Sequence, residues 1–460
     1  MHVAAIFLFE GSAPAHDELI EAIEGKLHLV PRYRQKLANV PFAQGRPLWV
    51  DDPHFNPGYH IRHTALPAPG GDEQLKTLAS RLFAQPLDRS KPLWEMWLVE
   101  GFADDRWALV SKTHHALVDG VSGVDITAVL LDASPEPAPV APPENAWVPV
   151  PEPHPTVLLA EALLERATQP REIVRGLRAL TRAPRQALAQ AAELAGGLAA
   201  QVAAGIDSAP PSPFNVDIGP HRRYEWVDAS VPSFKAIKTA LGGTLNDVVV
   251  TAVALALGRS LRRRGEDTTD LVLKVMVPVS IRADAEHGAL GNRVANMYAP
   301  LPVGLADSVE CFASVHASME DLKSSGQAVG AEAITRLGEF APPTIMSQAA
   351  RLQARQRFFN LVVTNVPGPQ IPLYVLGRKM TALYPVVPLA QRQALGIAVM
   401  SYDGRLGFGL LSDQAAVPDL ADIAADLRTA IADLERAAGV SRSRRASSNG
   451  ASKPKVPAGR

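Results

Sequence analysis

The chain has 460 residues, enough for two or three domains, and 47% of them are hydrophobic, so a sizeable core is expected. Its formal net charge of −1 excludes an overall polyanion-binding surface, and no specific nucleic acid is expected as a partner. The single cysteine, Cys311, excludes an internal disulfide and favours a reducing, intracellular setting, with the thiol buried on a helix.

Residues 1–133 are expected to form a mixed α/β region. Strand-like patterns occupy 1–11, 59–66, 94–102 and 106–117, and helical patterns occupy 16–27, 72–87 and 124–133. The first residues lack the features of a signal peptide. No apolar run reaches the roughly 20 residues that a membrane span needs, so any membrane contact is expected to be peripheral.

Residues 134–220 are expected to connect two α/β regions. The proline density of 134–155 predicts an extended linker, because proline disrupts helices and central strands. Ala- and Leu-rich helices are predicted over 156–206. One face of these helices carries arginines, which we interpret as a solvated surface or, alternatively, as a contact with an anionic membrane. The arginines are Arg171, Arg175, Arg178, Arg182 and Arg185.

Residues 221–437 are expected to form a second α/β region. A helix begins near residue 245, with Thr244 as its N-cap and Asp247 three positions on. Strands are predicted at 271–282 and 358–369, a hairpin at 394–413, and a final helix after it. The tail, 438–460, is basic and is expected to be disordered, with only a weak attraction to anionic lipid or RNA.

The sequence HHALVDG, at 114–120, admits several interpretations. Two adjacent histidines on a strand can be one core and one surface residue. A metal site through His115 and Asp119 would need a third ligand, and no HExxH or CxxC pattern accompanies them. A neutral imidazole could instead act as a general base, oriented by a carboxylate, with Gly120 leaving room for substrate. Serine-triad chemistry is disfavoured because no GxSxG elbow is present.

Several motifs together resemble one family. HHALVDG resembles the HHxxxDG motif of CoA-dependent acyltransferases with the chloramphenicol acetyltransferase-like fold. KPLWEMWLVEG at 91–101, LNDVVVTAVALALGRSLR at 245–262 and TNVPGP at 364–369 resemble motifs of the bacterial wax ester synthase/diacylglycerol acyltransferase (WS/DGAT) family. VPVSIRAD at 277–284 and LGNRVANMYAPLP at 290–302 resemble two further segments of it, in the same order.

The resemblance implies a mixed α/β fold of two acyltransferase subdomains, 1–133 and 221–437, with the active site in a channel between them. It implies transfer of a long-chain acyl group from acyl-CoA to diacylglycerol or a fatty alcohol. His115 would be the general base, with no acyl-enzyme, His114 would support it, and Asp119 would orient the loop, with Arg282 as a candidate partner. Further structural or substrate-binding candidates are Gly120, Asn246, Asp247, Asn292, Asn365, Pro367 and Trp94.

No metal or cofactor is expected, since acyl-CoA is a substrate. The expected location is cytoplasmic, in peripheral contact with a membrane or lipid droplet. Alternative hypotheses are an acyltransferase for polyketide or other secondary-metabolite hydroxyls, a silent acyl-CoA- or lipid-binding relative, and a metal-dependent hydrolase. Family members usually carry a segment resembling LSxxDxxFL before the first strand. The printed sequence does not include this segment, which supports the hypothesis of a silent relative.

Overall fold

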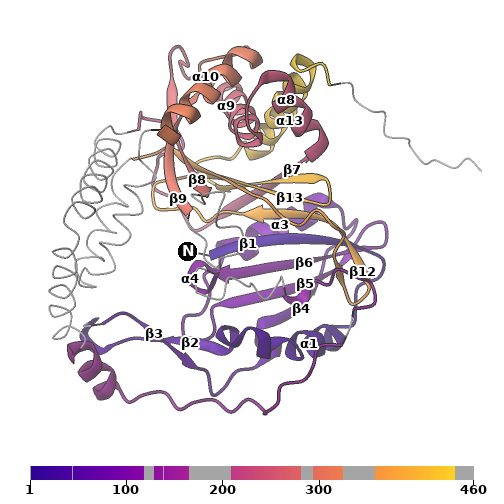
Figure 1. Ribbon diagram of the computed structural model, residues 1–460, viewed down its shortest axis with the longest axis vertical. Coiled ribbons are helices and arrows are strands. Elements are labelled where there is room, and N and C mark those ends of the chain that lie inside the picture. Colours follow the sequence, from indigo (N-terminus) through magenta and orange to yellow (C-terminus); the bar gives the residue numbers. More distant parts are fainter. Residues whose placement is uncertain are drawn as a thin grey trace, which may run out of the picture.

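The computed structural model describes residues 2–43, 45–118, 129–137, 139–164, 209–280, 294–324 and 358–440. Two six-stranded sheets and a small hairpin sheet account for the strands in these ranges, and helices cover them (Figure 1). The predicted mixed α/β class is therefore confirmed. The sequence positions 119–128, 165–208, 281–293, 325–357 and 441–460 lie outside the description, so the predicted arginine face and basic tail are not placed.

The first sheet forms the centre of the N-terminal domain. Phe7 and Phe9 of its first strand pack into one core and Ile6 and Leu8 into another, so the strand is buried on both faces. In spatial order the sheet is β11 (Tyr374–Val375), β12 (Arg378–Val386), β1 (His2–Glu10), β6 (Arg106–His114), β5 (Trp94–Phe102) and β4 (Ile61–Ala65). Its helices are α1 (His16–Glu24), α2 (Pro57–His60), α3 (Asp72–Ala84) and α4 (His115–Val118).

The second sheet carries a layer of helices on the face away from the first sheet (Figure 1). In spatial order it is β7 (Arg222–Ser230), β14 (Arg405–Asp413), β13 (Leu395–Tyr402), β10 (Leu361–Val366), β8 (Val272–Ser280) and β9 (Val294–Pro302). The helices are α8 (Val231–Leu241), α9 (Leu245–Arg263), α10 (Ser308–Ser324) and α13 (Leu420–Ala437). The predicted hairpin at 394–413 is confirmed as β13 and β14, and the final helix as α13.

Two glycines let the sheets approach each other closely. A Cβ at Gly407 would overlap the carbonyl oxygen of Leu383, and one at Gly409 that of Pro385. Beside this contact Trp226 of β7 stacks on Tyr384 of β12, with ring centroids 4.8 Å apart. The second sheet therefore packs directly on β12, and we call this contact the seam.

Helix α3 also joins the two sheets. Its Lys76 forms a buried ion pair with Glu225 of β7 at 2.7 Å and lies over the ring of Trp226. In addition, the hydroxyl of Tyr384 donates to the carboxylate of Asp228 at 3.1 Å. Strands β11 and β12 lie within 221–437 in the sequence but belong to the first sheet. The predicted C-terminal subdomain therefore contributes two strands to the sheet of the N-terminal one.

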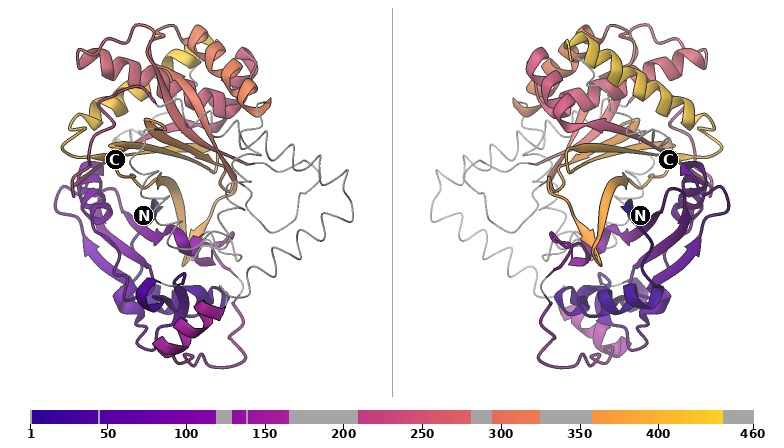
Figure 2. Two further views of the ribbon diagram at one scale, coloured as in Figure 1. Left: turned by 90° about the vertical axis from the view of Figure 1, so that its left-hand side faces the viewer. Right: turned by 90° about the vertical axis from the view of Figure 1, so that its right-hand side faces the viewer.

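A hairpin sheet lies below the first sheet, at the end of the molecule away from α10 and α13 (Figures 1 and 2). Its strands are β2 (Gln35–Ala38) and β3 (Leu48–Asp51), and the short turns around it are η1 (Leu27–Leu29), η2 (Pro31–Arg34) and η3 (Pro41–Ala43). Residues 139–164, which we call the strap, run along this hairpin and end in the helix Pro155–Leu164. The predicted linker is thus extended, and it also packs.

The strap is held by specific contacts. The N–H of Val150 donates to the Asp51 carboxylate at 2.9 Å, and Arg34 lies 4.6 Å from the ring centroid of Trp147. Leu158 and Ala162 of the helix are buried against the hairpin. No described helix is by itself long and apolar enough to cross a membrane; α8 and α9 pass such a test only as a pair bent by 95°.

Candidate active site

The paired histidines stand where a buried central strand ends. Residues 107–113 of β6 are buried, and the strand is flanked by β1 and β5. The backbone N–H of His114 donates to the carbonyl of Leu93 at 2.8 Å. This hydrogen bond joins the end of β6 to the residue that precedes β5. His115 then begins α4, whose Leu117 is buried in the first core. His115 is therefore half-buried and directly follows a buried central strand.

The ring of His114 is fixed in one role. The N–H of Ala116 donates to its Nδ1 at 3.2 Å, so that nitrogen must be an acceptor. Burial lowers the pKa of His114, which keeps the ring neutral near pH 7 and the acceptor available. His114 thus closes the turn into α4 and holds the backbone of its neighbour His115.

Other buried polar groups brace the same strand end. His2 of β1 pairs in register with His114, and its Nε2–H donates to the carbonyl of Phe83 at 3.0 Å. Burial lowers the pKa of His2 to about 4. Lys112 forms an ion pair with Glu95 and donates to the last carbonyls of α3, including Leu82 at 2.9 Å. These contacts fix β6 against α3.

Trp94 begins β5, the strand beside the one that ends at His114. It is buried, it pairs in register with Thr113, and its Nε1–H donates to the carbonyl of Tyr33 at 2.8 Å. The ring stacks on His60, with centroids 4.7 Å apart, and the Nδ1–H of His60 donates to the Trp94 carbonyl. Trp94 is placed as a packing residue that supports β6.

Asp247 serves the start of α9. Its carboxylate accepts the N–H of Thr244 at 2.8 Å, and its own N–H donates to the Thr244 hydroxyl, so the predicted N-cap is confirmed. The carboxylate also accepts Nδ1–H of His316 on α10 at 2.9 Å. Asn246, which precedes it, is half-buried in the first helical turn. Asp247 thus caps α9 and ties it to α10.

The sequence TNVPGP ends β10 as a tight turn against the β13–β14 hairpin. The N–H of Gly368 donates to the Ser401 hydroxyl at 3.1 Å, and a Cβ there would overlap the Ser401 carbonyl. Asn365 is half-buried and Pro367 exposed. Since β10 and β8 are parallel, with Val362 opposite Met276, Asn365 lies toward the end of β8 that reaches Ser280.

Not all predicted site residues are placed. His114 and Trp94 lie on neighbouring strands of the first sheet, and His115 begins α4 directly after His114. Asn246 and Asp247 lie on α9, and Asn365 and Pro367 lie at the end of β10. The remaining four, Asp119, Gly120, Arg282 and Asn292, lie outside the described residues. Sequence reasoning missed His2, Lys112 and His316, because only long-range pairing gives these side chains their partners.

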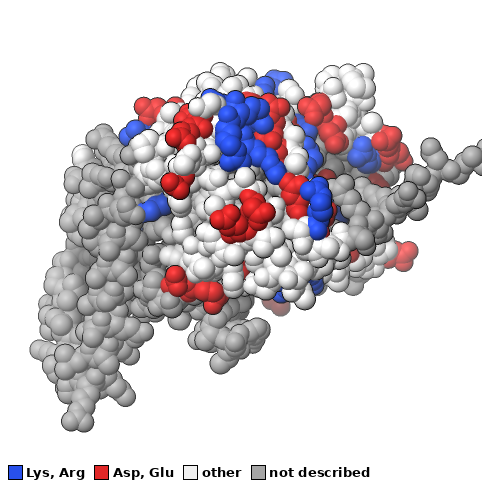
Figure 3. Space-filling model, turned by 90° about the horizontal axis from the view of Figure 1, so that it is seen from above, with Lys and Arg blue, Asp and Glu red and all other residues white. Residues whose placement is uncertain are grey.

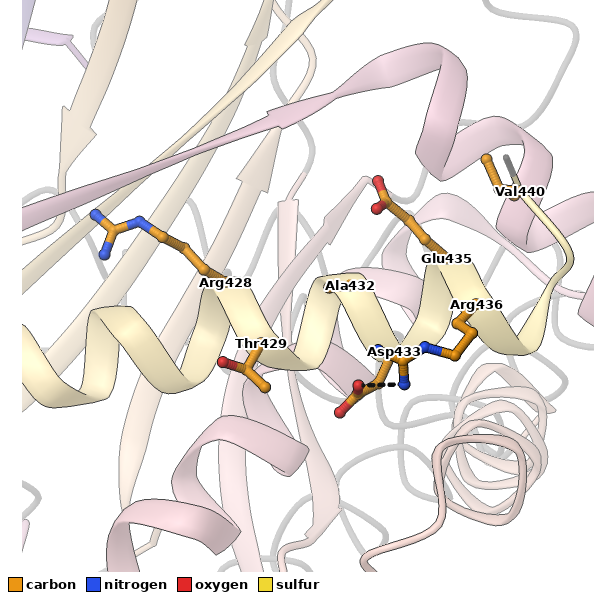
Figure 4. A pocket seen from close by; sticks show the side chains of 7 residues that line it. All are labelled: Arg428, Thr429, Ala432, Asp433, Glu435, Arg436 and Val440. Atoms are coloured by element: carbon orange, nitrogen blue, oxygen red, sulfur yellow. Dashed lines mark hydrogen bonds and ion pairs between the residues drawn. The ribbon is translucent and has the colours of Figure 1, made fainter. Parts of the chain in front are cut away.

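Two hollows among the described residues are lined by side chains other than His114 and His115. One of about 570 Å³ is lined by the last turns of α13 (Figure 4). Its charged residues are paired there: Arg436 with Asp433 at 2.9 Å, and Glu435 with the hydroxyl of Ser233 at 2.7 Å. Another of about 380 Å³ lies beside Lys26 and Asp132. Neither touches the histidines, so the channel between the domains stays a prediction.

The described part of the chain offers no site for metal chemistry or for a cysteine nucleophile. No group of three or more His, Cys, Asp or Glu there could hold a metal ion. Cys311 is buried on α10, as predicted, and burial raises the pKa of its thiol to about 12, so it is not a thiolate nucleophile.

Comparison with known proteins agrees with this architecture. The wax ester synthase/diacylglycerol acyltransferase catalytic domain matches residues 1–249, and the WS/DGAT C-terminal domain matches residues 290–435. A Mycobacterium tuberculosis protein named "Probable diacyglycerol O-acyltransferase tgs2" is 34% identical over 451 residues, 96% of each chain. Another from that species, tgs1, is 32% identical over 440 residues, 94% of this chain and 90% of that one.

Solved structures show the same fold. The wax ester synthase/diacylglycerol acyltransferase from Marinobacter aquaeolei VT8 superposes with a TM-score of 0.64, 27% identity and 95% coverage of both chains. The first condensation domain of the calcium-dependent antibiotic synthetase superposes with a TM-score of 0.56 at 14% identity, covering 95% of this chain and 91% of that one, which is a likeness of fold alone. The chain belongs to the wax ester synthase/diacylglycerol acyltransferase family.

Proposed function

We propose that this protein transfers a long-chain acyl group from acyl-CoA to the hydroxyl of diacylglycerol or of a fatty alcohol. A ring nitrogen of His115 takes the hydroxyl proton while the oxygen attacks the thioester carbonyl. The new C–O bond forms, the C–S bond breaks, and the CoA sulfur leaves as a thiolate that takes the proton from His115. No acyl-enzyme forms, because the acceptor itself attacks the thioester.

The observation that carries this proposal is the position of His115 at the end of β6. It follows a buried strand, and its neighbour His114 is locked by the Ala116 N–H, within a region that matches the WS/DGAT catalytic domain. A base held this way loses little entropy on reaching its substrate. The names of relatives from Mycobacterium and Marinobacter support diacylglycerol and alcohol as acceptors.

We also propose that the enzyme works in the cytoplasm, in peripheral contact with a membrane or lipid droplet. Diacylglycerol and fatty alcohols partition into lipid, so an enzyme that uses them gains from working at that surface. Asp119 would orient the His115 loop, with Arg282 as its partner, and Gly120 would leave room for substrate. Asn292 and Asn365 would bind substrate in the channel.

The test is thiol release from palmitoyl-CoA with hexadecanol, with diacylglycerol and with neither. We expect release only with an acceptor, and we expect His115→Ala to lower it about 10²- to 10⁴-fold. His221→Ala is the matched control, because His221 is exposed on the segment before β7. Acceptor-independent release would indicate a hydrolase, whereas no release with either acceptor would favour a secondary-metabolite acceptor or a silent binding protein.

A further inference from the structure

A buried lysine lies two residues before the paired histidines. Lys112 of β6 exposes 1% of its side chain and forms an ion pair with Glu95, which exposes 7%. The ammonium also donates to the backbone carbonyls of Leu82 at 2.9 Å and Gln85 at 3.0 Å. An ammonium carries three N–H bonds, so these three partners can take all of them. Lys112 is therefore held from three directions at a place closed to solvent.

The ion pair joins four elements of the N-terminal domain. Glu95 of β5 stands directly opposite Lys112 in the register of the two strands, and its other carboxylate oxygen lies 3.5 Å from Arg62 of β4. The carbonyls of Leu82 and Gln85 belong to the last turn and the C-cap of α3, where backbone oxygens lack helical partners and carry partial negative charge. One buried cluster thus binds β4, β5 and β6 to the end of α3.

The same face of β6 leads to the histidines. Successive side chains of a strand point to opposite faces, so Lys112 and His114 share a face. His2, opposite His114 on β1, donates from Nε2 to the carbonyl of Phe83, again at the end of α3. The helix end is therefore bonded both to β6 and to its neighbour, and His115 is the first residue after this bonded segment.

Stability alone does not account for a charged pair at this depth. Removing two charges from water costs free energy, and apolar side chains of similar volume often stabilise a protein as well or better. At the end of the molecule with α10 and α13, by contrast, basic and acidic side chains lie at the surface (Figure 3). There Arg263 pairs with Asp426 at 2.8 Å and is 41% exposed, so water can replace its partner. The buried pair instead gives β6 a fixed position on α3, because each N–H of Lys112 has a specific acceptor.

We propose that Lys112 and Glu95 form a positioning pair, which fixes the end of β6 on α3 and so holds His115 where it takes the proton of the acceptor hydroxyl. This rests on the proposed function, which assigns that proton transfer to His115. The pair acts through the backbone of β6 and the turn that His114 closes with the Ala116 N–H, not through contact with the substrate.

Three variants separate positioning from stability. Lys112→Met leaves Glu95 buried without its cation, so it should lower both the melting temperature and kcat. Lys112→Met/Glu95→Met removes both charges, so the melting temperature should return toward that of wild type, while β6 loses its side-chain bonds to α3. Lys76→Met is the matched control, because Lys76 also lies on α3, exposes 10% of its side chain and pairs with Glu225 of the second sheet at 2.7 Å.

We expect kcat to fall about ten- to hundredfold in Lys112→Met and to stay low in the double variant, with the KM for acyl-CoA little changed. Lys76→Met should lose stability but keep a kcat near that of wild type. Recovery of kcat together with stability in the double variant overturns the proposal, because the pair would then serve folding alone. So does an equal fall of kcat in Lys76→Met.

Chemical labelling tests the position of His115 without turnover. Diethyl pyrocarbonate acylates a neutral imidazole, and fragment-ion mass spectrometry separates the rate at His115 from that at His114. We expect Lys112→Met and the double variant to change the His115 rate at least about threefold, because a loosened strand end opens more often, and Lys76→Met to leave it unchanged. An unchanged rate in all three variants contradicts positioning. A wild type that releases no CoA with either acceptor contradicts the proposed function, and labelling then decides the positioning of His115 on its own.

Discussion

The two histidines of the motif have different surroundings although they are neighbours. The ring of His114 is hydrogen-bonded to the backbone, because its Nδ1 accepts the Ala116 N–H. Burial lowers the pKa of His114, so the ring stays neutral. His115 is half-buried at the first residue of α4. His114 is accordingly a positioning residue, and His115 is the one that we assign to the reacting hydroxyl.

That distinction predicts how substitutions of His114 behave. His114→Ala removes the acceptor at Nδ1, so His115 should be misplaced and kcat should fall roughly ten- to hundredfold with little change in KM. His114→Asn should recover most of the activity, because an asparagine side-chain oxygen accepts the N–H two residues on. Steady-state kinetics of both variants checks this; equal losses in both would contradict the positioning role.

At the scale of single elements, local sequence patterns predicted much of the fold. The apolar runs of β5, β6 and β8, the Thr244 cap of α9 and the β13–β14 hairpin all follow from nearby residues. The pairing of β12 with β1 does not, because it joins residues such as Phe7 and Leu383 that are far apart in sequence. For the same reason the partners of His2, Lys112 and His316 could not be predicted.

The close packing at the seam predicts that one added methyl group lowers the stability of the protein. Gly409→Ala would place a Cβ against the Pro385 carbonyl, so we expect a loss of about 1–3 kcal/mol in the free energy of unfolding. Gly25→Ala is the control, because Gly25 has φ −60° and its nearest neighbour would be an ordinary 3.4 Å away. Chemical denaturation of both variants gives the comparison; equal stabilities would mean that the seam yields easily.

For the whole molecule, buried histidines predict how stability depends on pH. Burial lowers the pKa of His2 and of His60 from 6.5 to about 4. Between these values the unfolded chain binds protons that the folded protein does not. The stability is therefore fully present above pH 6.5 and falls as the pH drops to 4, by on the order of 1 kcal/mol per pH unit for each group.

Thermal unfolding across this range, for wild type and for His60→Asn, measures the effect. His60→Asn removes one titrating group, so its stability should fall less steeply with decreasing pH. His221→Asn, at an exposed position, should keep the wild-type slope. A wild-type stability that is constant from pH 6.5 to 4 would refute the burial of neutral histidines.

The account as a whole depends on direct acyl transfer assisted by His115. The most direct measurement is the ester formed from palmitoyl-CoA and hexadecanol or diacylglycerol, quantified by mass spectrometry beside the CoA released. We predict one ester per CoA for wild type and a rate lower by about 10²- to 10⁴-fold for His115→Ala. Ester formation by His115→Ala at the wild-type rate, in a protein that unfolds at the wild-type temperature, would contradict the account.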